Sequence, residues 1–173
     1  MIYYEDKATT LYFGNCLDVM PQLPEQCFDA CLTDPPYEVT ASEWDYKIDF
    51  TPLWKELHRL VKPDGATVLF GTQPFSSAAV MSNWQEFRHE WIWEKNRGSN
   101  FLNAKKQPVK IHEQILVFSQ DAPIYLPQKT TGHEPVNFAR RKANSSSVYN
   151  SHKEYTNNAG DTTRYPKSIH YFK

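Results

Sequence analysis

The chain has 173 residues, of which 40% are hydrophobic and 14% are aromatic. This length supports one hydrophobic core and excludes two full-sized domains. No apolar run reaches the length of a membrane span, and the first residues lack the basic and apolar regions of a signal peptide. We therefore expect a cytoplasmic protein with no membrane partner.

The formal net charge of −1 conceals two oppositely charged halves. Residues 1–94 contain 6 Lys and Arg against 15 Asp and Glu, whereas residues 95–173 contain 13 against 5. The basic half also carries aromatic side chains that can stack on bases. This combination favours an anionic partner for the second half, and nucleic acid fits it best.

The cysteines and histidines are too scattered to predict a metal site. Cys16, Cys27 and Cys31 form no Cys-x2-Cys pair, and the six histidines show no metal-ligand spacing. We interpret the three cysteines as reduced thiols of the core and expect no bound metal.

Hydrophobic patterning predicts strands that alternate with helices in an α/β fold. We expect strands at residues 8–13, 28–33, 66–70, 87–94 and 112–119, and helices at residues 16–20, 50–61 and 76–84. A turn is expected at residues 62–65. This order predicts a doubly wound sheet with a β-hairpin at one edge. We expect residues 1–120 to form this sheet and residues 121–173 to form a loop-rich recognition region.

The segment Asp34-Pro35-Pro36-Tyr37 directly follows the apolar run at residues 28–33. One interpretation is that the two prolines only end the strand, because proline has no amide hydrogen to donate to a sheet. A carboxylate, a fixed backbone and an aromatic ring also form a rigid cup with hydrogen-bond acceptors and a stacking face. Such a cup suits a flat base that carries an exocyclic amine.

Six segments in this order resemble the β-class of DNA amino-methyltransferases, which use S-adenosylmethionine (SAM) and occur in phages and restriction–modification systems. They lie at residues 14–20, 34–37, 60–65, 70–75, 91–95 and 112–118. The resemblance implies a Rossmann-like sheet and covers about residues 10–120. It also implies that residues 121–173 correspond to the variable target-recognition region.

The resemblance implies that the chain methylates the N6 amine of an adenine that is flipped out of double-stranded DNA, with cytosine N4 as the alternative. Asp34, Pro35, Pro36 and Tyr37 would be catalytic. The Asp34 carboxylate and the Pro35 carbonyl would accept the two amine hydrogens and favour a tetrahedral nitrogen, and Tyr37 would stack on the base. Asn15 and Cys16, together with Asp34, would bind SAM, although family members usually carry Asp at position 15.

Basic residues outside the cup are expected to contact DNA phosphates. They are Lys95, Arg97, Lys105, Lys106, Arg140, Arg141 and Lys142. The first four lie between the last two expected strands, and the other three form the main basic cluster of the tail.

The sequence contains only six glycines and no Gly-rich strand–loop–helix motif for the cofactor. We therefore expect a truncated or split product whose sheet is incomplete at the C-terminus and exposes an apolar edge. One alternative is a subunit that binds DNA, a complementary chain or a second copy of itself without turnover. Methylation of RNA or of protein amides is a further possibility.

Overall fold

The computed structural model describes residues 1–143 and 154–172, apart from the side chain of Arg141. The chain divides into two compact units. The first comprises Met1–Tyr125 and Ser168–Lys173, and the second comprises Leu126–Lys167. None of the described helices is both long and apolar enough to cross a membrane.

The first unit contains three helices, two short 3₁₀ turns and seven strands among the described residues. They are β1 (Ile2–Glu5), β2 (Thr10–Tyr12), α1 (Cys16–Val19), η1 (Met20–Gln22), β3 (Phe28–Thr33), α2 (Phe50–Leu60), β4 (Val61–Gly71), α3 (Phe75–Ser82), β5 (Phe87–Ser99), η2 (Phe101–Asn103), β6 (Lys110–Phe118) and β9 (Ile169–Tyr171). In the second unit, β7 (Arg140–Arg141) pairs with β8 (Tyr155–Thr156).

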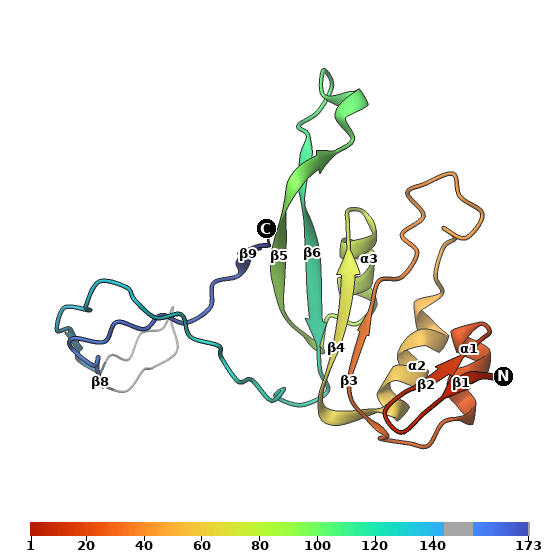
Figure 1. The fold of residues 1–173 in the computed structure, drawn as a ribbon, viewed down its shortest axis with the longest axis horizontal. Coiled ribbons are helices and arrows are strands. Elements are labelled where there is room, and N and C mark those ends of the chain that lie inside the picture. The colour runs from red at the N-terminus through yellow and green to blue at the C-terminus, as the bar shows by residue number, and fades with distance from the viewer. Residues whose placement is uncertain (144–153, 173) are drawn as a thin grey trace. The chain divides into compact units, whose positions relative to one another are not determined.

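Five strands form a mixed sheet in the order β3-β4-β6-β5-β9 (Figure 1). Strands β3 and β4 are parallel, β4 and β6 are antiparallel, and β5 and β6 form an antiparallel hairpin. The terminal strand β9 pairs in parallel with β5. The expected mixed α/β architecture is therefore present.

One face of this sheet carries the hydrophobic core. Leu69 of β4 lies opposite Leu116 of β6, and both pack with Trp54 of α2 and Phe75 of α3. The two helices are joined by a hydrogen bond of 2.8 Å from Trp54 Nε1 to Ser82 Oγ. Both longer helices therefore cover the same face, and the doubly wound arrangement remains a prediction.

The helix α2 follows from its sequence. The Asp49 side chain accepts a hydrogen bond of 2.9 Å from the Thr51 amide and so caps the first turn. Apolar residues then recur at helical spacing, which places Trp54, Leu57 and Leu60 in the core. The expected helix at residues 50–61 is confirmed to within one residue.

Several elements differ from the sequence-based expectations. The expected turn at residues 62–65 is an irregular part of β4, where the register with β3 shifts. The strand β9 was not predicted, and it joins the last residues to the sheet of the first unit. The interpretation of the cysteines as core thiols is wrong for Cys16 and Cys27, which are exposed, whereas Cys31 is partly buried.

The loop between β3 and α2 is organised by one carboxylate. Asp45 is only 7% exposed. Its Oδ1 accepts hydrogen bonds from the amides of Tyr37 and Glu38, each at 2.7 Å. Its Oδ2 accepts from the amides of Val39 and Thr40 at 2.9 and 2.6 Å. A single side chain therefore binds four consecutive backbone amides.

This arrangement fixes a backbone conformation that is otherwise unfavourable. Glu38 has a φ of 58°, in the left-handed region that side chains other than glycine rarely adopt. The four hydrogen bonds converge on the residues on both sides of this turn. The carboxylate of Asp45 therefore determines how the chain leaves Asp34-Pro35-Pro36-Tyr37.

Acid is expected to release this loop. Burial raises the pKa of Asp45, but the hydrogen bonds from Thr40, Glu38 and Val39 outweigh it and hold the pKa at about 2, below the ordinary 3.8. Because the pKa of Asp45 is lower in the folded state, its ionised carboxylate stabilises the loop fully above pH 3.8. This stabilisation is lost as the pH falls through about 2. Amide exchange of residues 37–40 measured against pH checks this expectation.

Asp45→Asn should produce the same loss at neutral pH, because its NH2 group cannot accept the Val39 and Thr40 amides. Asp49→Asn is the matched control, since Asp49 binds one amide of α2 outside the loop. Equal protection of residues 37–40 in the wild type and in Asp45→Asn would contradict the assigned role.

The strand β3 leaves one edge of the sheet open among the described residues. It pairs only with β4, and Leu32 on this strand is 70% exposed. An unpaired strand edge with apolar side chains is a template for pairing with another chain. The described part of the sheet therefore ends at β3 in an open strand edge, and the missing strands expected from the sequence remain a prediction.

We expect this edge to cause self-association. Light scattering of the wild-type chain should show an apparent mass that rises with protein concentration. Leu32→Lys should reduce the rise, because a charged edge disfavours strand pairing. Leu126→Lys, a change of an equally exposed leucine in the second unit, is the control. A wild-type chain that remains monomeric at high concentration would contradict the prediction.

Candidate active site

The parallel pair of β3 and β4 places two chain segments at the same edge of the sheet. Asp34 follows the last residue of β3, and Thr72 follows the last residue of β4. Thr33 is paired with Leu69, so the two strands end close together. Ligands of α/β sheets bind at the carboxyl ends of such strands.

The Asp34 carboxylate and the Tyr37 ring contact each other. The Tyr37 hydroxyl donates a short hydrogen bond to Asp34 Oδ1. Asp34 Oδ2 has no hydrogen-bond partner among the described residues, and the side chain is exposed. The carboxylate is thus oriented by one oxygen and offers the other to a ligand.

Tyr37 itself is held on three sides. Its ring is half-buried and packs on Phe75, with ring centroids 5.1 Å apart. Its amide is bound by Asp45. Burial, the hydrogen bond to Asp34 and the nearby charge of Glu113 raise its pKa far above the ordinary value of 10. The hydroxyl therefore remains protonated at neutral pH and acts as a donor.

A cavity of about 300 Å³ lies beside this edge. The end of β4 lines it with Gly71, Thr72 and Gln73, and the β5–β6 hairpin lines it both from β6, with Lys110, Glu113 and Gln114, and from the connection between its strands, with Asn100, Gln107 and Pro108. None of residues 34–37 lines this cavity, which adjoins the end of β4 next to the strand that precedes the tetrapeptide. This volume is at the lower end of the range of small-molecule sites and can take a nucleobase.

The cavity wall contains one cation, Lys110, and one anion, Glu113, and Glu113 also pairs with Lys95, which does not itself line the cavity. The Lys110 ammonium hydrogen-bonds to the Thr72 hydroxyl. Burial lowers the pKa of Lys110, and the charge of Lys95 acts in the same direction, while Glu113 opposes both. The wall therefore presents fixed polar groups to anything that enters.

The proposed cofactor residues lie at the start of α1. Asn15 Oδ1 caps this helix by accepting a hydrogen bond of 2.9 Å from the Leu17 amide. Burial raises the pKa of the Cys31 thiol of β3, and the charge of Cys16 acts in the same direction. Cys31 precedes Asp34 by three residues. Asn15 and Cys16 lie at the start of α1, and their role in cofactor binding remains a prediction.

The basic residues expected to bind DNA are placed in different surroundings. Arg97, Lys105 and Lys106 are exposed in or near the tip of the β5–β6 hairpin. Lys95, by contrast, is partly buried in its pair with Glu113, where the ammonium lies 5.2 Å from the centre of the Trp93 ring.

The remaining basic cluster lies in the second unit. Arg140 pairs with Glu154, and Lys142 is exposed. The backbone of Arg141 belongs to β7, but its side chain lies outside the described part of the chain.

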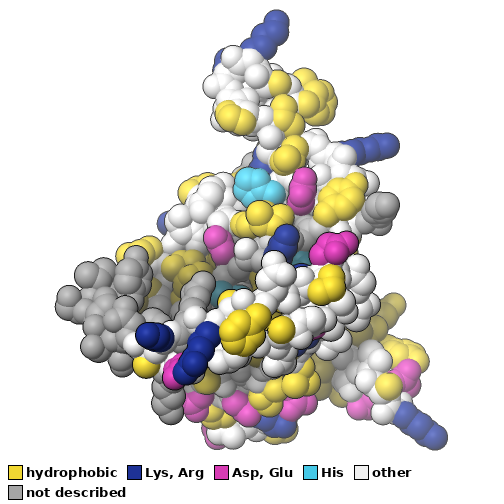
Figure 2. All heavy atoms as spheres, turned by 90° about the vertical axis from the view of Figure 1, so that its left-hand side faces the viewer, with side chains coloured by type: hydrophobic (Ala, Val, Ile, Leu, Met, Phe, Trp, Pro, Cys, Tyr) yellow, Lys and Arg dark blue, Asp and Glu magenta, His cyan; other side chains and the backbone are white. Residues whose placement is uncertain are grey.

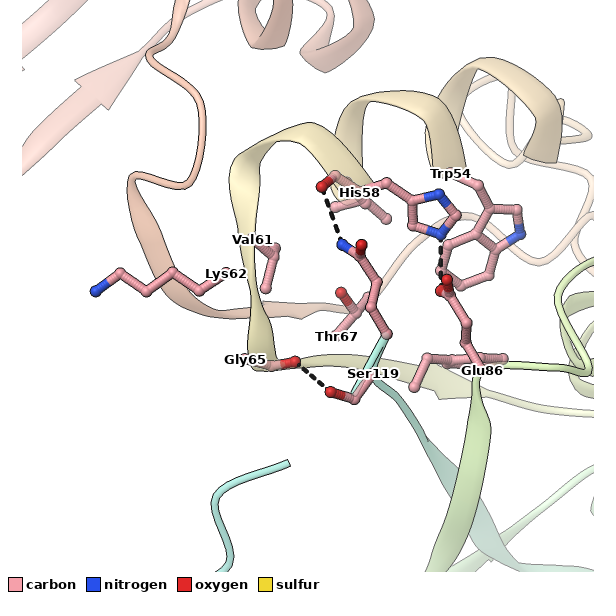
Figure 3. A pocket seen from close by; sticks show the side chains of 11 residues that line it. Trp54, His58, Val61, Lys62, Gly65, Thr67, Glu86 and Ser119 are labelled. Carbon is pink, nitrogen blue, oxygen red and sulfur yellow. Dashed lines mark hydrogen bonds and ion pairs between the residues drawn. The ribbon is translucent and has the colours of Figure 1, made fainter. Parts of the chain in front are cut away.

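A second hollow lies at the opposite end of the sheet (Figure 3). It has a volume of about 10 Å³, enough for at most one water molecule. His58 Nε2 lies 2.7 Å from Glu86 Oε2, and Ser119 Oγ donates to the Gly65 carbonyl at 2.8 Å. The first contact joins α2 to the residue before β5, and the second joins the residue after β6 to β4, so the hollow is a structural junction.

Sequence patterns did not reveal Asp45, and they did not predict that Thr72 and Lys110 contact each other. Asp45 lies in a loop without periodicity, and Thr72 and Lys110 become neighbours only through the pairing of β4 with β6. The only local feature that indicates Asp45 is its spacing of eight residues from Tyr37, because a loop of this length can fold back and place a carboxylate against the Tyr37 amide. No described group of His, Cys, Asp or Glu could hold a metal ion.

Known DNA methyltransferases resemble this chain in sequence and in fold. The DNA methylase family (N6/N4) matches residues 28–169. The type II methyltransferase M1.MboII of Moraxella bovis is 30% identical over 118 residues, which cover 61% of this chain and 44% of that protein.

Two solved methyltransferase structures are similar to this chain to different degrees. The cytosine-N4-specific PvuII DNA methyltransferase has a TM-score of 0.52 at 16% identity, covering 66% of this chain and 50% of that chain. The complex of M1.HpyAVI with SAM has a TM-score of 0.44 at 18% identity, covering 78% and 59%. Of the two, the PvuII enzyme supports a shared fold.

The chain spans about half the length of these relatives. The family match nevertheless covers most of the chain, including β3, the tetrapeptide, the Asp45 loop and the β5–β6 hairpin. The chain therefore belongs to the N6/N4 DNA methylase family, a family of SAM-dependent methyltransferases.

Proposed function

We propose that this chain carries the catalytic part of a DNA methyltransferase that methylates the N6 amine of an adenine flipped out of the duplex. The observation that best supports this proposal is the Asp34 carboxylate, which Tyr37 orients through Oδ1 and which is open to a ligand at Oδ2. Asp34 at the start of the tetrapeptide favours adenine, since cytosine enzymes of this class more often begin it with serine. Cytosine N4 is the alternative, and the PvuII enzyme is named for that base.

The amine of adenine is a weak nucleophile because its lone pair is delocalised into the ring. Asp34 Oδ2 accepts one of its hydrogens, and the Pro35 carbonyl accepts the other. These two acceptors favour the tetrahedral nitrogen over the planar one, which selectively stabilises the transition state. Pro35 and Pro36 fix the backbone, and Asp45 fixes the chain that follows.

SAM supplies an electrophilic methyl group on a positively charged sulfonium. The acidic half of the chain, with 15 Asp and Glu against 6 Lys and Arg, suits this cation. Asn15 and Cys16 at the start of α1 would hold the cofactor beside β3, with Asp34 at the end of that strand. The Asn15 carbonyl oxygen can accept a second hydrogen bond besides the one from Leu17.

The remaining groups position the base. The cavity of about 300 Å³ that Thr72 and Lys110 help to line would receive it once it leaves the duplex. Tyr37 would stack on the base with the part of its ring that does not contact Phe75. Stacking of this kind offsets part of the cost of flipping. The second unit, Leu126–Lys167, would contribute to target recognition, with phosphate contacts from Arg140, Arg141 and Lys142.

Methyl transfer to unmethylated genomic DNA tests this proposal without knowledge of the target sequence. Wild-type chain and tritiated SAM should label the DNA, and digestion to nucleosides should yield N6-methyladenine. Asp34→Asn should lower kcat by about 10²-fold with little change in DNA affinity, because a neutral amide with one acceptor oxygen replaces the charged carboxylate with two. Recovery of N4-methylcytosine instead would replace adenine by the alternative base.

Asp29→Asn is the matched control for Asp34→Asn. Asp29 lies on the same strand and is exposed, and it forms only a surface pair of 2.5 Å with Lys62. Such pairs contribute little to stability, so the control should keep full activity. Undiminished turnover in Asp34→Asn would overturn the catalytic assignment.

Cofactor binding is a separate expectation for Asn15. Isothermal titration of the wild-type chain with SAM should show one site. Asn15→Ser keeps a helix cap but shortens the side chain, so the affinity should fall several-fold while the helix content by circular dichroism stays constant. Asn15→Asp keeps both the cap and the acceptor and should bind normally. Absence of heat with the wild-type chain would show that these residues do not hold SAM on their own.

A further inference from the structure

The β5–β6 hairpin extends past the rest of the sheet. The pairing of β4 with β6 ends at Gly71 and Gln114, whereas β6 begins at Lys110 and β5 continues to Ser99. The projecting hairpin is visible in Figure 1, beyond the ends of β3 and β4. A projecting two-stranded ribbon has the dimensions of an element that enters a DNA groove.

The tip of this hairpin presents two large apolar side chains to solvent. Phe101 is 71% exposed and Leu102 is 85% exposed. They occupy the first two positions of η2, directly after Asn100, whose φ of 64° turns the chain at the tip. Nothing in the described part of the chain covers them.

The tip is ordered by its own hydrogen bonds. The Asn103 amide donates to the Asn100 carbonyl at 3.0 Å, and the Asn103 side chain donates to Asn100 Oδ1 at 2.6 Å. The amides of Ala104 and Lys106 donate to the Phe101 and Asn103 carbonyls at 3.1 and 2.8 Å. Phe101 and Leu102 are therefore held outward on a closed turn.

The charge around this apolar tip has one sign. Residues 95–112 contain five basic residues and no acidic residue. Arg97, Lys105 and Lys106 are exposed, and hydrophobic and basic side chains occur together on the projecting part of the molecule in Figure 2. An apolar tip that contacts a membrane or another protein does not need purely basic neighbours. An apolar tip that contacts a polyanion such as DNA does need them.

We propose that Phe101 and Leu102 form a wedge that inserts between base pairs of duplex DNA, while Arg97, Lys105 and Lys106 bind the flanking phosphates. Apolar wedges on proteins that open DNA enter base steps and replace lost stacking. Here the wedge fills the gap that the flipped base leaves. This inference rests on the proposed function for its duplex substrate, and it assigns a role to two side chains, Phe101 and Leu102, that do not line the cavity, although the neighbouring Asn100 does.

Binding to a duplex that already contains a gap tests the wedge without any methyl transfer. Fluorescence anisotropy is measured on a short duplex and on the same duplex with one abasic site. The wild-type chain should bind the abasic duplex about tenfold more tightly, because stacking of an aromatic ring replaces the missing base. Phe101→Ala should bind both duplexes equally, and Phe101→Tyr should keep the preference.

Two controls separate the wedge from general effects. Phe13→Ala removes an equally exposed ring, 75% exposed, from outside the hairpin and should leave the preference unchanged. Lys105→Gln with Lys106→Gln should weaken binding to both duplexes alike and lower the salt slope by about two, since two phosphate contacts are lost.

The outcomes distinguish this inference from the proposed function. A wild-type chain without abasic preference, or a preference that survives Phe101→Ala, overturns the wedge even if methyl transfer occurs. A preference that depends on Phe101 supports the wedge even if the chain transfers no methyl group. Failure to bind either duplex overturns the wedge and the DNA substrate together.

Discussion

One carboxylate determines the shape of the site. Asp45 binds the four amides of residues 37–40 and so holds the backbone that leaves the tetrapeptide. Without it, the left-handed turn at Glu38 has no compensating contacts, and the Tyr37 amide is unsupported. The hydrogen bond from the Tyr37 amide to Asp45 holds the backbone of Tyr37, and Phe75 packs against its ring. The Tyr37 hydroxyl in turn orients Asp34. The geometry at Asp34 therefore depends on a residue eleven positions away.

The architecture explains why these groups meet. Parallel pairing of β3 and β4 brings Asp34 and Thr72 to one edge, and antiparallel pairing of β4 and β6 adds Lys110, Glu113 and Gln114. The same two pairings build the core around Leu69 and Leu116 on one face. The same strand pairings therefore form the core and bring the residues of the candidate site together at the ends of the strands.

Local patterns predicted those parts of the structure that local interactions determine. The helix α2 follows from apolar spacing and the Asp49 cap, and the tetrapeptide is identifiable because its four residues are contiguous. The strand β9 could not be predicted, because three residues become a strand only through pairing with β5. Asp45 was missed for a similar reason, since no pattern indicates which carboxylate faces a row of amides. Lys95 was expected on phosphates, but pairing of β5 with β6 brings it to Glu113.

The central claim is that Asp34 and the Pro35 carbonyl together hold the two hydrogens of an extruded amine. A crystal structure of the chain with duplex DNA and a non-reactive SAM analogue measures this directly. The account predicts an exocyclic nitrogen within about 3 Å of both Asp34 Oδ2 and the Pro35 oxygen, with the base beside Tyr37. A target base that remains stacked in the duplex, or an amine bound by other groups, would contradict it.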